Sequence, residues 1–348
     1  MATFTSIVLT LALGAGSVVP GLKPVDLPPP PMPVFPALEA PAIDASSWKV
    51  YSATREAEIG SKNPDAQSAP ASITKLLTAI LVVENLSLDS QATVSTRAGS
   101  TPIGYVGQED VRTGETWVVR DLLSLIMVGS GNVASATLGE AVSGSPEAFA
   151  VLMNQKAQAI GMANSHFVNA HGLDAEGQVS TANDLIALGR EALLHPDVLA
   201  TTRIKSIPFR LAPREFTVDS TNRLLGVFPG YLGLKTGDTV SAGQVLLSYT
   251  ETQHDRILAV VLGSKGRRVA TRELVAWAMT TMGPRDHFFA PVVGTELALL
   301  LPEWYLPRLA AAGGLDGGEP TAPDRTPLTD DLNARFREML PVLLGGDP

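Results

Sequence analysis

Three short polar motifs constrain the fold of this 348-residue chain most, because they make chemical sense only if folding brings them together. They are, in order, Ser72-Ile73-Thr74-Lys75, Ser130-Gly131-Asn132 and Lys235-Thr236-Gly237. Together they supply a serine nucleophile, a lysine to take its proton, a hydroxyl with an amide, and a second lysine. This set is typical of acyl transfer by serine enzymes in which lysine replaces histidine as the base.

Lys-Thr-Gly occurs once, but the patterns of the first two motifs occur more than once. The neighbouring residues must therefore decide which copy is functional. Ser46-Ser47-Trp48-Lys49 has the spacing of the first motif, but 48–53 is predicted to be a strand, where residues three apart face opposite sides. Ser61-Lys62-Asn63 and Ser220-Thr221-Asn222 match the second motif. The former is predicted to be a turn leading into Asn63-Pro64-Asp65.

The first motif is predicted to open a buried helix that runs to Glu84, because the residues after it are apolar on every side. Pro70 suits the first helical position. Lys75 would share a helix face with Ser72, and the free N–H of Ser72 would be an oxyanion donor. The structural alternative is a capping serine beside a lysine whose stem lies along the surface.

The second and third motifs are predicted to lie in a loop and on a strand. Glycines on both sides of Ser130 separate two helical runs, 121–128 and 133–142, so the loop could aim Ser130 and Asn132 into a cleft or merely cap a helix. Lys235 lies in a predicted strand, 231–236, and the following runs form a hairpin over 243–262. Gly237 would let a peptide backbone approach this strand; alternatively, Lys235 only protects a sheet edge.

The motifs and their surroundings resemble the serine D-alanyl-D-alanine carboxypeptidases, which are low-molecular-weight penicillin-binding proteins with a β-lactamase-like fold. The resemblance covers about 48–283 and includes the stretches 70–79, 169–174, 180–185, 221–225 and 233–237. Two positions depart from the family pattern. Val133 replaces the usual acidic residue, and Asp238 replaces an aromatic, histidine or small residue. Asp238 should repel a substrate carboxylate.

The resemblance implies roles for the motif residues. Ser72 would attack the penultimate D-alanine carbonyl while Lys75, neutral because its pKa is lowered by burial and by Lys235, takes the proton. Ser130 would pass that proton to the leaving D-alanine. The substrate-binding residues would be Asn132 for the substrate amide, Lys235 and Thr236 for the terminal carboxylate, Gly237, and Asp238 through its backbone N–H. An arginine often assists the carboxylate, and the candidates are Arg267, Arg268 and Arg272.

The resemblance therefore predicts an enzyme that hydrolyses the terminal D-alanine of peptidoglycan stem peptides, needs no cofactor or metal, and binds β-lactams. Two alternatives remain. A β-lactamase shares the motifs but needs a carboxylate for deacylation, and the Glu-x-x-Leu-Asn stretch that carries it in class A enzymes is absent. A weakened cell-wall-binding homologue is favoured only by Val133 and Asp238. The net charge of −9 gives no nucleic-acid footprint.

The predicted fold class is α+β, with an antiparallel sheet flanked by helices and an inserted helical lobe. The catalytic domain is predicted over 43–285, the helical lobe over about 95–205, and the sheet from strands in 46–60 and 206–263. The motifs would meet in the cleft between lobe and sheet. The five histidines show no metal-ligand spacing, and the chain has no cysteine.

The N-terminal segment predicts export. Residues 1–19 have the apolar core of a signal peptide, although no basic residue precedes it, and 20–42 form a proline-rich linker. The protein is thus expected in the periplasm or on the extracellular face. The C-terminal extension, 286–348, contains a linker, 313–326, and an amphipathic segment, 331–344. That segment could touch a membrane peripherally or pack on the domain; packing is favoured.

Overall fold

The computed structural model describes residues 39–102, 111–211, 213–228, 230–252 and 255–281. The predicted signal peptide, almost all of the proline-rich linker and the C-terminal extension lie outside these residues. In the part of the chain that the structure describes, no helix combines the length and the hydrophobicity needed to cross a bilayer.

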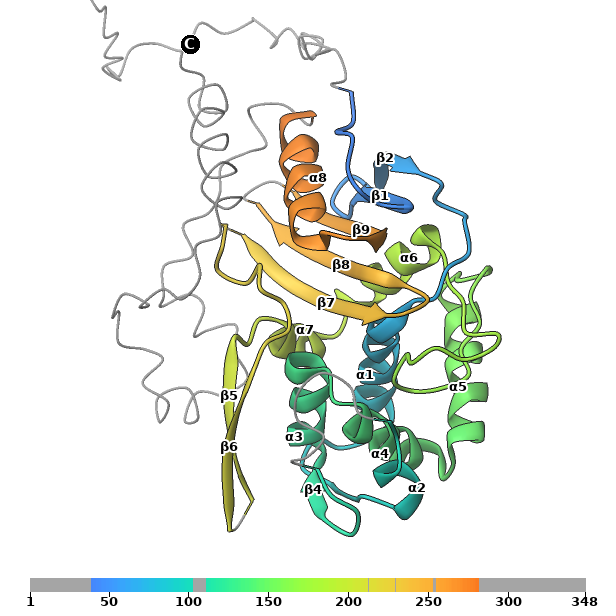
Figure 1. The fold of residues 1–348 in the computed structure, drawn as a ribbon, viewed down its shortest axis with the longest axis vertical. Helices are drawn as coiled ribbons and strands as arrows, with labels where there is room; N and C mark the ends of the chain where they lie inside the picture. Colours follow the sequence, from blue (N-terminus) through green and yellow to red (C-terminus); the bar gives the residue numbers. More distant parts are fainter. Residues whose placement is uncertain (1–38, 103–110, 212, 229, 253–254, 282–348) are drawn as a thin grey trace, which may run out of the picture. The chain divides into compact units, whose positions relative to one another are not determined.

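A five-stranded antiparallel sheet forms the centre, with the strand order β2-β1-β9-β8-β7 (Figure 1). Its strands are β1 (Ser47–Ser52), β2 (Ala57–Lys62), β7 (Tyr231–Thr239), β8 (Gly243–Glu251) and β9 (Arg256–Ser264). The predicted hairpin over 243–262 is confirmed, because β8 pairs with β9. The N-terminal strands join this hairpin through β1, in which Ser47 lies opposite Leu262.

The central strand β9 is apolar on both faces because both are covered. One face meets the large core around α1 (Thr74–Asn85) and α6 (Ala182–Ala192), and the other meets α8 (Arg267–Thr281). The side chains alternate between the two cores: Leu258, Val260 and Leu262 on the first, and Ile257, Ala259 and Val261 on the second. Because side chains alternate between the two faces of a strand, one apolar run contributes residues to the hydrophobic cores on both sides of the sheet.

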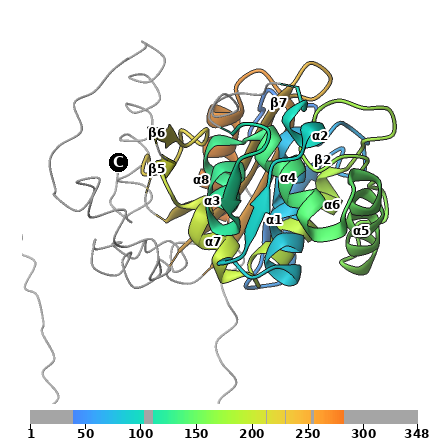
Figure 2. The ribbon, with the colours of Figure 1, turned by 90° about the horizontal axis from the view of Figure 1, so that it is seen from below.

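The inserted lobe surrounds α1 with helices (Figure 2). Its helices are α2 (Thr96–Gly99), α3 (Val119–Ser124), the π-helix η2 (Leu125–Gly129), α4 (Asn132–Ser143), α5 (Pro146–Ala159), α6 and α7 (Pro196–Thr202). A short ladder joins β3 (Gln91–Thr93) to β4 (Thr116–Val118). All of these helices fall within the predicted range of 95–205. Helix α1 is buried along most of its length, as its apolar sequence predicted.

The prediction that all strands from 206 onward join one sheet is wrong. β5 (Ser206–Leu211) and β6 (Arg214–Asp219) form a separate hairpin. Its apolar face packs on the helical lobe, where Phe209 and Phe216 contact Trp117 edge-on. Because the helical lobe already covers these aromatic rings, the hairpin does not need the central sheet to bury them.

Two local predictions also need correction. Ser72 lies not in the α-helix but in a preceding 3-10 turn, η1 (Ala71–Ile73), and Pro70 precedes this turn instead of occupying the first α-helical position. Ser61 and Lys62 end strand β2, and the turn starts only at Asn63, which has a positive φ of 48°. In both places, the structure shifts the predicted boundary by one to three residues.

Candidate active site

The first motif places an amine beside a hydroxyl at the junction of η1 and α1. Lys75 Nζ lies 2.9 Å from Ser72 Oγ and also donates a hydrogen bond to the carbonyl of His171. The Lys75 side chain is fully buried. Burial and the nearby charge of Lys235 hold the pKa of Lys75 well below its usual range. Lys75 therefore has the position that a general base for Ser72 would need, and its lowered pKa favours the neutral, proton-accepting form.

The turn that holds Lys75 begins at Asn169. Asn169 Oδ1 accepts hydrogen bonds from the N–H groups of Gly172, at 2.7 Å, and His171, at 3.3 Å. This geometry turns the His171 carbonyl towards Lys75. Burial and the charge of Lys75 lower the pKa of His171 to about 3, so its ring stays neutral. The contribution of His171 is therefore its backbone carbonyl, which contacts the predicted base Lys75.

The second motif reaches the site through two unusual backbone turns. The π-helix η2 ends at Gly129, and Ser130 adopts the left-handed conformation with φ 62°. Such a bulge changes the direction of the chain and is frequent at functional sites. Asn132 is the first residue of α4, not a loop residue, and its Nδ2 donates to the carbonyl of Pro102 at 3.2 Å. Val133 is only 3% exposed and belongs to the core, so an apolar residue suits this position.

The third motif lies on β7 and meets the second motif directly. Lys235 Nζ donates to Ser130 Oγ and to the Thr236 carbonyl, both at 3.0 Å. Burial and the charge of Arg267 lower the pKa of Lys235 to about 7. Thr236 Oγ1 lies 2.7 Å from the hydroxyl of Thr221, a residue that the motif search placed in a competing copy of the second motif. The structure thus joins Ser130, Lys235 and Thr236 in one polar cluster.

Gly237 allows β7 to lie against η1. A Cβ atom at this position would come within 2.8 Å of both the Ala71 Cβ and the Ser72 backbone nitrogen. The glycine is therefore required by the close approach of the strand to the turn that carries the nucleophile. This contact brings the first and third motifs together, with the second attached through Ser130.

The structure distinguishes among the three candidate arginines. Arg267, at the start of α8, donates from Nη1 to the Gly237 carbonyl at 2.8 Å, and this nitrogen is 3.6 Å from Asp238 Oδ2. Arg268 is exposed and shares with Arg267 the wall of a pocket beside Thr236. Arg272 lies one turn further along α8, and burial lowers its pKa. Spacing alone could not make this choice, since it depends on how α8 packs on the sheet.

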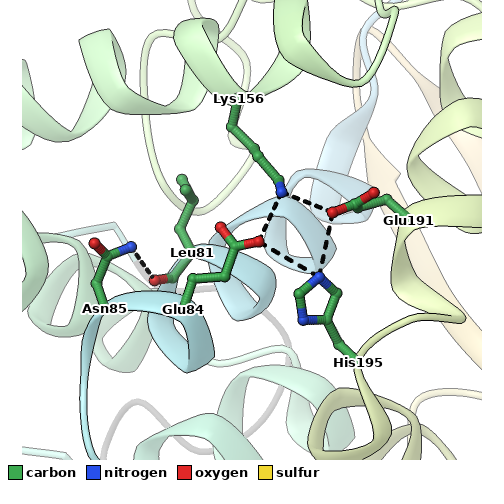
Figure 3. A network of polar contacts seen from close by, with 6 residues as sticks. All are labelled: Leu81, Glu84, Asn85, Lys156, Glu191 and His195. Carbon is green, nitrogen blue, oxygen red and sulfur yellow. Dashed lines mark hydrogen bonds and ion pairs between the residues drawn. The ribbon is translucent and has the colours of Figure 1, made fainter.

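A cluster of side chains away from the three motifs has the residue types of a metal site. The ligand atoms of Glu84, Glu191 and His195 all lie within 4.8 Å of one another. However, Lys156 Nζ is 2.6 Å from Glu84 Oε1 and 2.7 Å from Glu191 Oε1 (Figure 3). An internal ammonium group therefore already occupies the position between the two carboxylates, and the cluster is an ion-pair network.

The comparisons with known proteins agree with this geometry. A family model described as D-alanyl-D-alanine carboxypeptidase, peptidase S11, matches residues 36–266. The chain is 31% identical to D-alanyl-D-alanine carboxypeptidase DacD of Escherichia coli K12, covering 82% of this chain and 80% of the relative. It is 34% identical to DacC of the same strain, covering 69% of this chain but only 62% of that relative's length.

A solved structure gives the same result. Penicillin-binding protein D2 from Listeria monocytogenes, in its ampicillin-bound form, aligns with a TM-score of 0.61 at 32% identity, covering 68% of this chain and 98% of that chain. The fold is therefore of the penicillin-binding protein type, as predicted. Since the family model spans more than half of the sequence, the chain belongs to the D-alanyl-D-alanine carboxypeptidase family, peptidase S11.

Proposed function

We propose that this protein is a serine D-alanyl-D-alanine carboxypeptidase that removes the terminal D-alanine of peptidoglycan stem peptides. The observation that carries the proposal is a pair of buried lysine–serine contacts in one site, Lys75 with Ser72 and Lys235 with Ser130. The two lysines are close enough for the charge of Lys235 to lower the pKa of Lys75. One amine can thus stay neutral as a base while the other carries the charge that an anionic substrate requires.

In the proposed acylation step, Ser72 Oγ attacks the carbonyl carbon of the penultimate D-alanine and its proton passes to Lys75. The backbone N–H groups of Ser72 and Asp238 would stabilise the oxyanion. Ser130 would relay a proton to the leaving nitrogen as the peptide bond breaks, which releases D-alanine. Water then hydrolyses the Ser72 ester and regenerates the hydroxyl.

In the proposed substrate complex, Lys235 and Thr236 hold the terminal carboxylate, with Arg267 close to both through its contact with Gly237. Asn132 would hold the substrate amide from the opposite side of the site. β-Lactams would acylate Ser72 in the same way. We also infer that the protein is exported, because the family acts on the cell wall and residues 1–19 have the apolar core of a signal peptide.

Intact-mass analysis after penicillin treatment tests this proposal. Wild type should gain the mass of one penicillin and, without the drug, should release D-alanine from a pentapeptide. Ser72→Ala should do neither. Ser46→Ala is the matched control, because Ser46 begins the competing Ser-x-x-Lys copy and should behave as wild type.

The same measurement separates the alternatives. A stable adduct indicates a carboxypeptidase, whereas an adduct that hydrolyses within seconds indicates a β-lactamase. An adduct without D-alanine release indicates a cell-wall-binding homologue with weakened turnover. An adduct that persists in Ser72→Ala would contradict the assignment of the nucleophile.

A further inference from the structure

Asp238 directly follows the third motif and lies on the same face of strand β7 as Thr236. On β7 the side chains of Thr236 and Asp238 lie on the same side, because strand side chains alternate with a period of two. Thr236 is the proposed ligand of the substrate's terminal carboxylate. A second carboxylate therefore lies beside the place where the substrate carboxylate would bind, with 30% of its side chain exposed.

Arg267 is already engaged on this face. Its Nη1 donates to the Gly237 carbonyl at 2.8 Å and lies 3.6 Å from Asp238 Oδ2, while its backbone N–H donates to Gln244 Oε1 at 3.2 Å. The Arg267 side chain is only 18% exposed. The charge of Asp238 thus offsets the cation that would otherwise attract a substrate carboxylate most strongly.

The other charges near this face act less directly. Arg223 and Arg268 also line the adjoining pocket, but both are exposed, so solvent screens them more than Arg267. Lys235 is buried and donates a hydrogen bond to Ser130. Its charge would attract the carboxylate of a peptide substrate and that of a β-lactam equally. Asp238 is a described residue in contact with Arg267, and it carries the opposite charge. Its charge should therefore affect most directly whether the enzyme prefers a substrate with a free terminal carboxylate or one whose carboxyl end is blocked.

We propose that Asp238 is a specificity-determining residue that weakens the selection for a free terminal carboxylate. The enzyme would then cleave D-alanyl peptides whose last residue is amidated or extended at its carboxyl group, as well as peptides that end in a free acid. The inference rests on the proposed function. The pocket behind Thr236, with a volume of about 340 Å³, offers room for such an extension.

The physical reason is like-charge repulsion. A substrate carboxylate that approaches Thr236 and Arg267 comes close to the Asp238 carboxylate, and juxtaposed like charges oppose binding strongly. A neutral carboxamide does not suffer this repulsion and can still accept a hydrogen bond from Thr236 or Arg267. Asp238 thus lowers the affinity for the acid more than that for the amide.

The test compares two substrates that differ only at this group: a tripeptide ending in D-Ala-D-Ala, and the same tripeptide with a C-terminal amide. The products, D-alanine and D-alaninamide, are separated by chromatography, and kcat/KM is measured for each. Wild type should cleave both. In Asp238→Asn and Asp238→Ser, the ratio of kcat/KM for acid over amide should rise about tenfold, mainly through a lower KM for the acid.

Glu215→Gln is the matched control, because Glu215 is also a carboxylate paired with an arginine, Arg210, at 3.1 Å, but lies on the β5–β6 hairpin. It should leave the ratio unchanged. The inference is overturned if both Asp238 variants change the ratio by less than about threefold, if they change both substrates equally, or if wild type cleaves only the acid. Failure of the proposed function looks different: wild type would release neither product and form no penicillin adduct at Ser72.

Discussion

At the scale of single residues, the site depends on two buried lysines whose pKa values are both lowered, each by burial and by a different neighbouring charge. Lys75 is buried and lies near the charge of Lys235, so both burial and repulsion favour its neutral form. Lys235 is equally buried, but its pKa falls only to about 7, with Arg267 as the second cause after burial. Lys235 can therefore still be protonated near neutral pH, and its charge adds to the burial that favours the neutral form of Lys75.

The lowered pKa of Lys235 predicts the pH dependence of acylation. Lys235 carries its charge below about pH 7 and loses it above, so the second-order rate constant of penicillin acylation should fall as pH rises through that value. In Lys235→Arg the charge persists, since arginine stays protonated throughout this range. The fall on the alkaline side should then disappear, although the rate at its maximum drops because the guanidinium group has a different shape.

The measurement is the acylation rate of one penicillin from pH 5 to 10, with protein folding checked at each pH. An alkaline fall that stays at the same pH in Lys235→Arg would assign that titration to another group. Asp238→Asn is a useful companion, because it removes a nearby negative charge without removing a lysine.

At the scale of elements, three segments far apart in the sequence meet within van der Waals distance. The turn at 169–173 and strand β7 both lie against η1, the 3-10 turn that carries Ser72, and glycines occupy the closest points. A Cβ atom on Gly172 would lie only 1.9 Å from the Ala71 carbonyl oxygen, and Gly172 has φ +83°. The position of Ser72 therefore depends on the absence of side chains at Gly172 and Gly237.

Replacing Gly172 by alanine should displace η1 or the 169–173 turn. We expect Gly172→Ala to lower the free energy of unfolding by about 1–3 kcal/mol through overpacking and backbone strain, and to lower kcat/KM about a hundredfold by displacing the Ser72–Lys75 pair. Denaturant unfolding and D-alanine release measure the two effects.

Gly161→Ala is the control for this variant. Gly161 has a similar φ of +85°, but no atom lies within 4 Å of the Cβ that alanine would add. It should show the strain alone, with kcat/KM near that of wild type. Equal losses of activity in both variants would mean that backbone strain, and not the contact with Ala71, accounts for the effect.

Sequence patterns predicted the elements best where one pattern had one structural solution. The apolar run after Lys75 fits only a buried helix, and the two runs over 243–262 are joined by a short polar turn that makes them neighbours in a hairpin. The β5–β6 hairpin was misplaced because Phe209 and Phe216 make an apolar strand face that either the sheet or the helical lobe could cover. The alternation of apolar residues along a strand shows that one face is buried, but it does not show which other element covers that face.

For the site, the structure brings the three motifs together, and the contact of Lys75 with Ser72 and the nearby charge of Lys235 were expected from the sequence, whereas the other contacts were not. No sequence signal shows that Lys235 contacts Ser130, or that Arg267 and not Arg268 reaches Gly237. The Asn169 turn was visible as a stretch resembling the family, yet its contact with Lys75 runs through a backbone carbonyl. Backbone contacts carry no side-chain signature, which is why they require the folded structure.

At the scale of the whole described domain, an ion-pair network joins the end of α1 to the surrounding helices. Glu84 comes from α1, Lys156 from α5, Glu191 from α6, and His195 precedes α7 (Figure 3). Burial alone would lower the pKa of Lys156, but its hydrogen bonds to Glu191 and Glu84 outweigh this and raise it. The network thus favours the charged ammonium and fixes the distal end of the helix that carries Lys75.

Removing the central cation should destabilise the domain without changing the chemistry. Lys156→Met leaves two partly buried carboxylates facing each other, so we expect a loss of about 1–3 kcal/mol in the free energy of unfolding, with kcat/KM within about twofold of wild type. Arg97→Gln is the control, because the Arg97–Glu147 pair is largely exposed and its removal should change stability little. Equal stability of the two variants and wild type would show that the network does not hold α1.

The strand order has a consequence for the newly made chain. Ser46 bonds to Gly263, a partner 217 positions later, and β1 completes its ladder only with β9, the last strand of the sheet. During synthesis β1 and β2 can pair with each other early, but the edge of β1 that binds β9 has no partner strand until almost the entire domain has left the ribosome. Contacts between such distant positions form slowly. We expect the nucleophile to remain inactive throughout translation, and to gain its reactivity only when β9 enters between β1 and β8.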